Sequence, residues 1–422
     1  MNEALLVFLW KYRVLGNHFV TTDGEDVQVY HPGTENNHGG PDFINARMKI
    51  GDLLWAGNVE IHWRSSDWFR HEHDKDAAYD SVVLHVSMYH DTEVFTASGR
   101  KLNALDLNTR DLGAIIERYR FLNLSHDPVP CLVIPNLERI KLTGPWLTRL
   151  AVERLEKKAG ALAQQWIWEE GQWDRVFLLQ LFRSYGLPAN AEPFLRLARK
   201  FMLVRDQFGL DPDDYEAILL YLAGFIPGPS PDAYTVRLTE RAVRLVNGIP
   251  VMPRAAWKLL RMRPGGFPGL RIAQLAAGLT AIIQLNHNQR IEMEVAGWKT
   301  LLSMPAAPYW DHHFLPGVPT QRAWPKKPGS SFVDAIIINA VVPYLATVAH
   351  CSNEHALMSR ALAMLESCPA EDNRIIRLWT AAGIQPANAA ESQGMMELFQ
   401  SYCSRHRCLQ CRIGYLLLHQ QE

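Results

Sequence analysis

Acidic and histidine side chains with metal-binding chemistry gather between residues 40 and 90 of this 422-residue chain. Asp42 stands at the mouth of one apolar run, and Glu60 and His62 stand two positions apart in the next. Side chains two apart on a strand project from one face, so Glu60 and His62 should point the same way. Carboxylate oxygens suit Mg²⁺ or Mn²⁺, and such a cation acidifies water and stabilises phosphoryl charge. The pattern predicts a catalytic metal site made of Asp42, Glu60 and His62.

Further histidines indicate a competing site. His71 and His73 form a His-x-His pair beside two aspartates, and His85 lies in the next apolar run. Imidazoles together with carboxylates are typical ligands of Zn²⁺ or Mn²⁺. In this alternative, Glu60 is the base and the metal ligands are His62, His71, His73 and His85. The plainer alternative is that these histidines only form hydrogen bonds with carboxylates around a sheet.

Three of the six cysteines fall close together, at Cys403, Cys408 and Cys411. Three thiolates at this spacing can hold Zn²⁺ or an iron–sulfur cluster, and they need a fourth ligand. The predicted role is structural, because a bound metal would pin the C-terminal helix to the body of the protein. The alternative is a set of reduced cysteines on one helix. The sequence does not choose the fourth ligand among Cys131, Cys351, Cys368 and His406.

Basic residues flank a glycine- and proline-rich stretch at residues 264–269. Glycines let a backbone approach a ligand closely, and arginines bind phosphates through paired N–H groups. Arg261, Arg263 and Arg271 are therefore predicted nucleic-acid contacts. The alternative is a helix end, a turn and a new helix, with arginines that only face solvent.

The elements that must position the first site follow the order αβββαβ. Apolar residues at helical spacing predict a helix over 2–15, and Gly16-Asn17 stops it. Alternating or continuous apolar runs bounded by turn residues predict the strands. The other predicted elements are strands at 27–30, 43–50 and 53–63, a partly helical segment at 64–80 and a strand at 82–89.

From about residue 145 helical periodicity dominates. The predicted helices include 253–262 and a long one at 391–420, and residues 304–330 form a long loop. The fold class is α+β followed by all-α. We predict a mixed α/β domain at 1–130 and an all-helical domain at 131–422 that carries the cysteines.

The hairpin between the second and third strands sets a geometric condition. If Gly51-Asp52 is a strict two-residue loop, Asp42 faces Ile61 and Glu60 lies on the opposite face of the sheet. The metal site then cannot form. One irregularity in the hairpin restores it, and Gly57 is a candidate bulge.

Composition narrows the class of protein. A net charge of −1, with 48% apolar and 21% charged residues, is typical of a soluble globular protein and exerts no global attraction on nucleic acid. No run of about 18 apolar residues occurs, and the N-terminus lacks signal-peptide features. We therefore expect a cytoplasmic protein without a membrane partner. The oligomeric state is left open.

Pro41-Asp42 followed by Glu60-Ile61-His62, in this element order, resembles the core of the PD-(D/E)XK nuclease superfamily. Its members cleave phosphodiesters with a metal held by an Asp and a Glu, which implies these roles for Asp42 and Glu60 in a restriction-endonuclease-like fold over roughly residues 2–90. His62 stands where most members have lysine, although some replace it. A lysine is cationic at neutral pH, whereas a neutral imidazole acts as a base or a metal ligand. Some members also carry an iron–sulfur staple, with a different cysteine spacing.

The whole chain is also similar to an uncharacterised bacterial family, a domain of unknown function found widely in Bacteroidetes, and this similarity implies no activity. The motifs that carry it are Gly40-Pro41-Asp42-Phe43, Val59-Glu60-Ile61-His62, His71-Glu72-His73, Leu84-His85-Val86, Arg271-Ile272-Ala273-Gln274-Leu275-Ala276 and Cys408-Leu409-Gln410-Cys411.

The leading hypothesis is a metal-dependent nuclease that hydrolyses phosphodiester bonds of nucleic acid, with the helical part binding substrate or a partner. One alternative is a non-catalytic interaction or scaffold protein with a degenerate nuclease fold. Another is a histidine-metal hydrolase of a small molecule. The sequence does not distinguish DNA from RNA.

Overall fold

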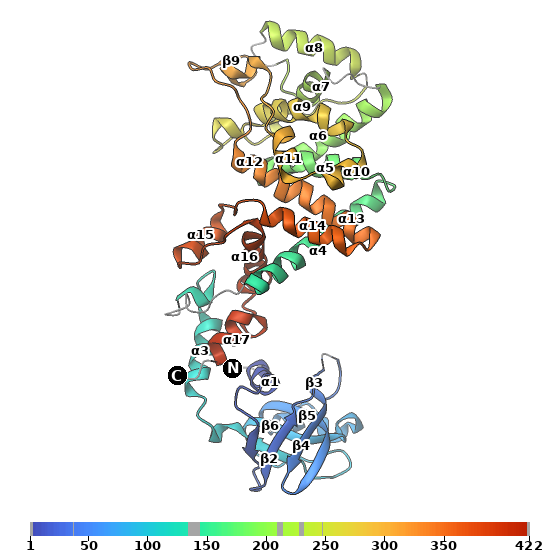
Figure 1. The fold of residues 1–422 in the computed structure, drawn as a ribbon. Helices are drawn as coiled ribbons and strands as arrows, with labels where there is room; N and C mark the ends of the chain where they lie inside the picture. The colour runs from blue at the N-terminus through green and yellow to red at the C-terminus, as the bar shows by residue number, and fades with distance from the viewer. Residues whose placement is uncertain are drawn as a thin grey trace. The chain divides into compact units, whose positions relative to one another are not determined.

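The computed structural model describes residues 3–36, 38–133, 144–208, 214–227, 232–246 and 248–419 (Figure 1). Two compact units make up the chain. The first, called the sheet unit below, is Met1–Leu142 together with Phe399–Glu422. The second, called the helical unit, is Thr143–Leu398. An N-terminal mixed sheet followed by a largely helical region agrees with the predicted α+β and all-α classes.

A seven-stranded mixed sheet forms the centre of the sheet unit. Its order is β1-β2-β4-β5-β6-β7, with β3 paired to β4. The pairs β5–β6 and β6–β7 are parallel, and the other pairs are antiparallel. The strands are β1 His18–Val20, β2 Asp26–His31, β3 Thr34–Glu35, β4 Phe43–Ile50, β5 Leu53–Arg64, β6 Val82–Tyr89 and β7 Asn103–Asp106.

The crossover between the parallel strands β5 and β6 supplies part of the candidate site. It contains the short helix α2 Asp67–Arg70 and two 3₁₀ turns, His73–Lys75 and Ala77–Tyr79. β6 is buried at every position except Tyr89. A parallel strand covered on both faces reads as a continuous apolar run, so a polar residue in it must find a polar partner.

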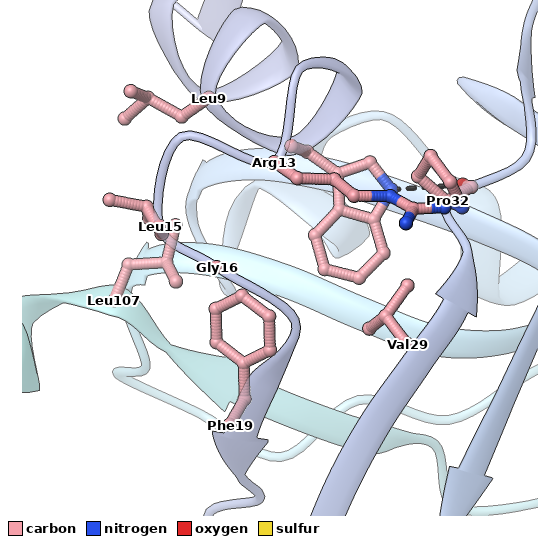
Figure 2. A pocket seen from close by; sticks show the side chains of 9 residues that line it. Leu9, Arg13, Leu15, Gly16, Phe19, Val29, Pro32 and Leu107 are labelled. Carbon is pink, nitrogen blue, oxygen red and sulfur yellow. Dashed lines mark hydrogen bonds between the residues drawn. The ribbon is translucent and has the colours of Figure 1, made fainter. Parts of the chain in front are cut away.

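Helix α1, Glu3–Lys11, packs on the sheet through an apolar stripe that includes Leu5 and Leu9. The Trp10 indole N–H donates to the Pro32 carbonyl at 3.0 Å. Figure 2 shows the small cavity beneath this helix, lined mainly by apolar side chains such as Leu9 and Phe19. Its volume of about 10 Å³ is at the lower limit for one water molecule, so the cavity is a packing gap.

The C-terminal segment differs from the single helix predicted over 391–420. Helix α16, Ala389–Ser401, is followed by two 3₁₀ turns, Cys403–Arg405 and Cys408–Gln410, and then by α17, Arg412–His419. His406, with φ of +50°, adopts the left-handed conformation that interrupts a helix. The prediction placed the cysteines in an all-helical domain at 131–422, whereas Cys403, Cys408 and Cys411 belong to the sheet unit.

The helical unit is a stack of short and medium helices around one apolar core. A segment predicted to be helical, 253–262, contains only the 3₁₀ turn Arg254–Ala256. The Asn190 side chain accepts from the Lys258 N–H and donates to its carbonyl, which occupies the groups that a helix would use. The helices of the helical unit are α4 Gly144–Trp168, α5 Trp173–Tyr185, α6 Leu187–Phe208, α7 Tyr215–Leu222, α8 Ala233–Leu245, α9 Pro268–Gln284, α10 His287–Glu292, α11 Val295–Leu302, α12 Ser330–Ile336, α13 Val342–Ser352, α14 His355–Glu366, α15 Arg374–Ala381 and most of α16.

One segment of the helical unit, Ser330–Ser352, is long and apolar enough to cross a membrane by length and composition. It joins α12, a π-helical stretch at Ile337–Val341 and α13. Within the unit, 89% of its apolar window is buried, which is the behaviour of a core helix.

Candidate metal-binding sites of the sheet unit

A bulge in the β4–β5 hairpin brings Asp42 opposite Glu60. Ile50 pairs with Leu53, as a two-residue turn requires, but Phe43 pairs with Val59, one residue out of that register. The shift lies between Phe43 and Ala46, where Asn45 has a φ of +59°. One extra residue in β4 moves Asp42 to the face that Glu60 occupies. The hairpin thus contains the irregularity that the predicted site requires.

Gly57, which sequence reasoning proposed as the bulge, has a different task. A Cβ atom there would lie 2.3 Å from Val83 Cγ1 and 2.8 Å from the Ser81 carbonyl oxygen. Only glycine lets β5 approach the start of β6 so closely. The register of the β5–β6 pair also shifts beside this point, between Asn58 and Val59.

Asp42 and Glu60 hold each other through the backbone. The Asp42 N–H donates to Glu60 Oε2 at 2.9 Å, and the Ile61 N–H donates to Asp42 Oδ2 at 3.0 Å. Burial, together with the neighbouring Glu60 charge, raises the pKa of Asp42 to about 7. Two adjacent carboxylates away from water create a site that a cation would stabilise.

His62 lies in the centre of the group and is 1% exposed. Its Nδ1 is 2.9 Å from His85 Nε2, and its Nε2 is 3.2 Å from His71 Nδ1. The same Nε2 lies 3.6 Å from Glu60 Oε1. Burial lowers the pKa of His62 to about 2, so the ring is neutral, and neutral imidazole is the form that binds metals.

His73 completes the carboxylate side of the group. Its Nε2 lies 3.3 Å from Glu60 Oε1, and its ring stacks on Tyr79 with centroids 3.8 Å apart. His71 ends α2 and is exposed, whereas His73 is buried. His62, His71 and His73 each offer one ring nitrogen, and these three atoms lie within 4.8 Å of one another.

The buried Trp68 and His85 form the inner wall. The Trp68 ring lies edge-on to His85 with centroids 5.5 Å apart. His85 is fully buried, and its Nδ1 has no hydrogen-bond partner among the described residues. Burial lowers the pKa of His85 to about 3, so this ring is also neutral. We infer that His85 sets the orientation of His62 and is not a ligand beside the other three.

The donor set fits a divalent cation. Two carboxylates suit Mg²⁺ or Mn²⁺, and the added neutral imidazoles favour Mn²⁺ or Zn²⁺. In the described residues, the ion pairs of Glu60 are with His62 and His73, so no lysine or arginine there takes the place of a metal. The sequence-predicted residues form one chain of contacts, in which Asp42 lies beside Glu60, Glu60 faces two of the three grouped histidines, and His85 lies behind His62.

The cysteines form a second group in the sheet unit, and Cys131 is its fourth member. Cys131 belongs to the 3₁₀ turn Pro130–Val133, which follows helix α3 Gly113–Leu124. Cys131, Cys403, Cys408 and Cys411 line one void of about 20 Å³, among apolar neighbours such as Leu122 and Ile413. All four are free thiols. Sequence reasoning offered Cys131 as one of several candidates for the fourth ligand, and the structure places it at the void that the other three cysteines line.

The thiols are close enough to affect one another. Burial raises the pKa of Cys131 to about 12, and the Cys411 and Cys408 charges raise it in the same direction. Burial also raises the pKa of Cys411, while hydrogen bonds from the Gly414 and Ile413 N–H groups act to lower it. Such N–H donors stabilise a metal-bound thiolate. Gly414 is required, because a Cβ there would lie 2.0 Å from the Cys408 carbonyl oxygen.

The predicted nucleic-acid contacts lie in the helical unit. Arg263 and Arg271 line one pocket there, together with Lys326 and Lys327, which sequence reasoning missed. Arg261 is exposed and does not line it. Both lysines lie in the Pro- and Trp-rich loop predicted at 304–330, but nothing in the sequence indicated that this loop lies beside Arg271.

Comparison with known families gives one match. Residues 3–374 match a family model described as "Protein of unknown function (DUF2851)". No curated protein and no solved structure matches the chain. The match spans most of the sheet unit and most of the helical unit, and it ends before Cys403, Cys408 and Cys411.

Proposed function

We propose that this chain, which belongs to the DUF2851 family of proteins of unknown function, is a metal-dependent nuclease that hydrolyses phosphodiester bonds of nucleic acid. The observation that carries the proposal is the bulge at Asn45, which places Asp42 opposite Glu60 at the edge of the histidine group. Five strands lie between α1 and α2, where the predicted order has three. The antiparallel run β2-β4-β5, followed by α2 and by the parallel strand β6, further supports a restriction-endonuclease-like core.

Asp42 and Glu60 would hold the cation, with His62, His71 and His73 as nitrogen donors. A bound divalent cation supplies an acidified water and offsets charge on the phosphoryl group. Because burial lowers the pKa of His62 to about 2, this ring is a poor proton acceptor and suits the role of ligand. His62 would thus replace the superfamily's lysine as a positioning group without replacing its charge.

The remaining contacts orient the ligands. The Asp42 N–H fixes Glu60 Oε2, while His73 and His62 face Glu60 Oε1. His85 and Trp68 keep water from the inner side of His62. His71, which is exposed, marks the side from which a substrate phosphate would approach.

The three-histidine group supports a second candidate function. His62, His71 and His73 offer ring nitrogens within 4.8 Å of one another, which suits Zn²⁺ or Mn²⁺ in a hydrolase of a small molecule. The two candidates share ligands and differ in substrate. Hydrolysis of bis(p-nitrophenyl) phosphate tests phosphodiester cleavage without nucleic-acid recognition, and cleavage of DNA and RNA strands tests the nuclease.

The cysteine group supports a structural metal, either Zn²⁺ or an iron–sulfur cluster. Four thiolates satisfy the ligand count of both. The bound group would tie the turn after α3 to the turns between α16 and α17, segments that are far apart in the sequence. Metal analysis combined with visible absorption separates iron from zinc.

The direct test is cleavage of labelled single- and double-stranded DNA and RNA by the full chain with Mg²⁺, Mn²⁺ or Zn²⁺. Asp42→Asn should reduce cleavage about 10³-fold or more, because one charged ligand is lost. The matched control is Asp52→Asn, at an exposed carboxylate in the turn of the same hairpin. If the native chain cleaves no strand with any of the cations, the nuclease proposal fails and the non-catalytic interaction protein is favoured.

A further inference from the structure

The pocket that contains Arg263 and Arg271 lies in the helical unit, and the proposed function leaves it unused. Its volume is about 460 Å³, within the range of small-molecule sites. Its walls are the 3₁₀ turn Pro264–Gly266, the first turns of α9 and the segment around Trp324 to Lys327.

The charge of the pocket has one sign. Arg263, Arg271, Lys326 and Lys327 line it, and none of its lining residues, all of them described, carries a carboxylate. The Lys326 ammonium donates to the Asp311 and Trp324 carbonyl oxygens at 2.8 and 3.4 Å, whereas Arg263 and Lys327 are exposed. An anion in the pocket would relieve the repulsion among these positive charges.

A buried glutamine joins Arg271 to the segment that carries Lys326. Gln274 is 3% exposed, accepts from Arg271 Nη1 at 2.9 Å and donates to the Lys326 backbone carbonyl at 3.0 Å. The Arg271 guanidinium lies 3.4 Å from the centroid of Phe332. A guanidinium held in this way keeps its positive charge at one place on the pocket wall, where it attracts an anion.

Aromatic rings share the pocket with the cations. Phe314 and Trp324 line it, and Trp324 is 46% exposed. The Lys326 ammonium lies 3.2 Å from the centroid of Trp324 and 4.8 Å from that of Phe314. Exposed aromatic rings beside phosphate-binding cations are the combination that holds a nucleobase next to its phosphate.

We propose that this pocket binds a nucleotide, with the phosphate on Arg263, Arg271 and Lys327 and the base against the Trp324 side. The ligand is either a free nucleotide or one nucleotide of a single strand, which share this chemistry. The site does not depend on the proposed nuclease, because it lies within the helical unit and uses none of the metal-site residues.

The test is equilibrium binding to the full chain carrying Asp42→Asn, in EDTA, so that cleavage cannot interfere. The probes are a labelled short single-stranded oligodeoxynucleotide, AMP and inorganic phosphate. The double variant Arg263→Gln/Lys327→Gln should weaken binding about tenfold or more, because both side chains are exposed and would face the phosphate. The control is Arg261→Gln, which removes one positive charge from the same segment outside the pocket and should change binding less than about twofold.

The three probes distinguish a free nucleotide from a nucleotide of a single strand. If AMP competes with the oligonucleotide, the site takes nucleotides from either source. Binding of AMP alone indicates a free nucleotide, and binding of the oligonucleotide alone indicates a strand. The proposal is overturned if none of the probes binds, if inorganic phosphate binds as well as AMP, or if Arg261→Gln weakens binding as much as the double variant. Cleavage activity enters none of these outcomes, so they do not depend on the nuclease proposal.

Discussion

The two units differ in how their buried acidic side chains are partnered. In the sheet unit, the buried Glu60 lies beside His62 and His73, and its ion pairs among the described residues include no lysine or arginine. In the helical unit, the buried Glu397 pairs with Lys157. Because a buried charge is costly without a partner, an added cation would stabilise the site in the sheet unit, whereas the chain itself supplies the cation to Glu397 in the helical unit.

The two candidate metal sites of the sheet unit also differ from each other. The histidine and carboxylate groups form hydrogen bonds with one another, so the site is ordered before a metal binds. The four thiols have mainly apolar neighbours, and burial raises the pKa of Cys408 to about 11. We infer that the first site exchanges its cation readily, whereas the second needs its metal to be stable.

The largest expected effect is at the cysteines. Cys131→Ser should abolish binding of the proposed zinc or iron and lower the free energy of unfolding of the sheet unit by about 5 kcal/mol or more. Metal analysis and thermal unfolding of the full chain measure both quantities. The control is Cys351→Ser, at an exposed thiol of the helical unit. If Cys131→Ser retains all of its metal, the two sites of the sheet unit do not differ in their need for a metal.

A smaller effect is expected at Gly57. Gly57→Ala places a methyl group against Val83 and the Ser81 carbonyl, so it should lower the free energy of unfolding by about 1–3 kcal/mol. It should also reduce activity, because β5 carries both Gly57 and Glu60. Denaturant unfolding and the cleavage assay measure these changes. Gly39→Ala, at a position with open space around it, is the control, and equal effects of the two changes would contradict the role of close strand packing.

The smallest effect concerns a cation of the helical unit. Lys158 donates to Asn339 Oδ1 and Gln393 Oε1, and burial lowers its pKa to about 8 from 10.5. Between these two values the unfolded chain holds a proton that the folded chain has released. Stability from this group therefore rises with pH from about 8 to 10.5, and it is lost as pH falls through 8.

Lys158→Met should abolish that rise. The free energy of unfolding of the native chain, minus that of the variant, should grow between pH 8 and pH 10.5. Urea unfolding at several pH values measures the difference. Lys258→Met removes an exposed lysine of the helical unit and serves as the control. The same pH dependence in both variants would show that burial of Lys158 is not its cause.

Local signals were sufficient for most of the elements. The strand β4 begins and ends where alternation and turn residues predicted, at Phe43 and Ile50, because a half-buried strand imposes a period of two on its own residues. The prediction of a helix at 253–262 was wrong, because the Asn190 side chain, which is distant in sequence, binds the Lys258 backbone groups. The helix over 391–420 was wrong in the middle, where His406 takes a left-handed conformation.

The sequence by itself determined the chemistry present: the pair Asp42 and Glu60, the neighbouring histidines and three clustered cysteines. It also determined the change from strands to helices, because that pattern is local. The tertiary structure alone decided that a bulge at Asn45 aligns the carboxylates, that Cys131 joins the other thiols and that Lys326 joins Arg271. These facts depend on register and on contacts between residues far apart in the chain, and spacing along one sequence does not specify them.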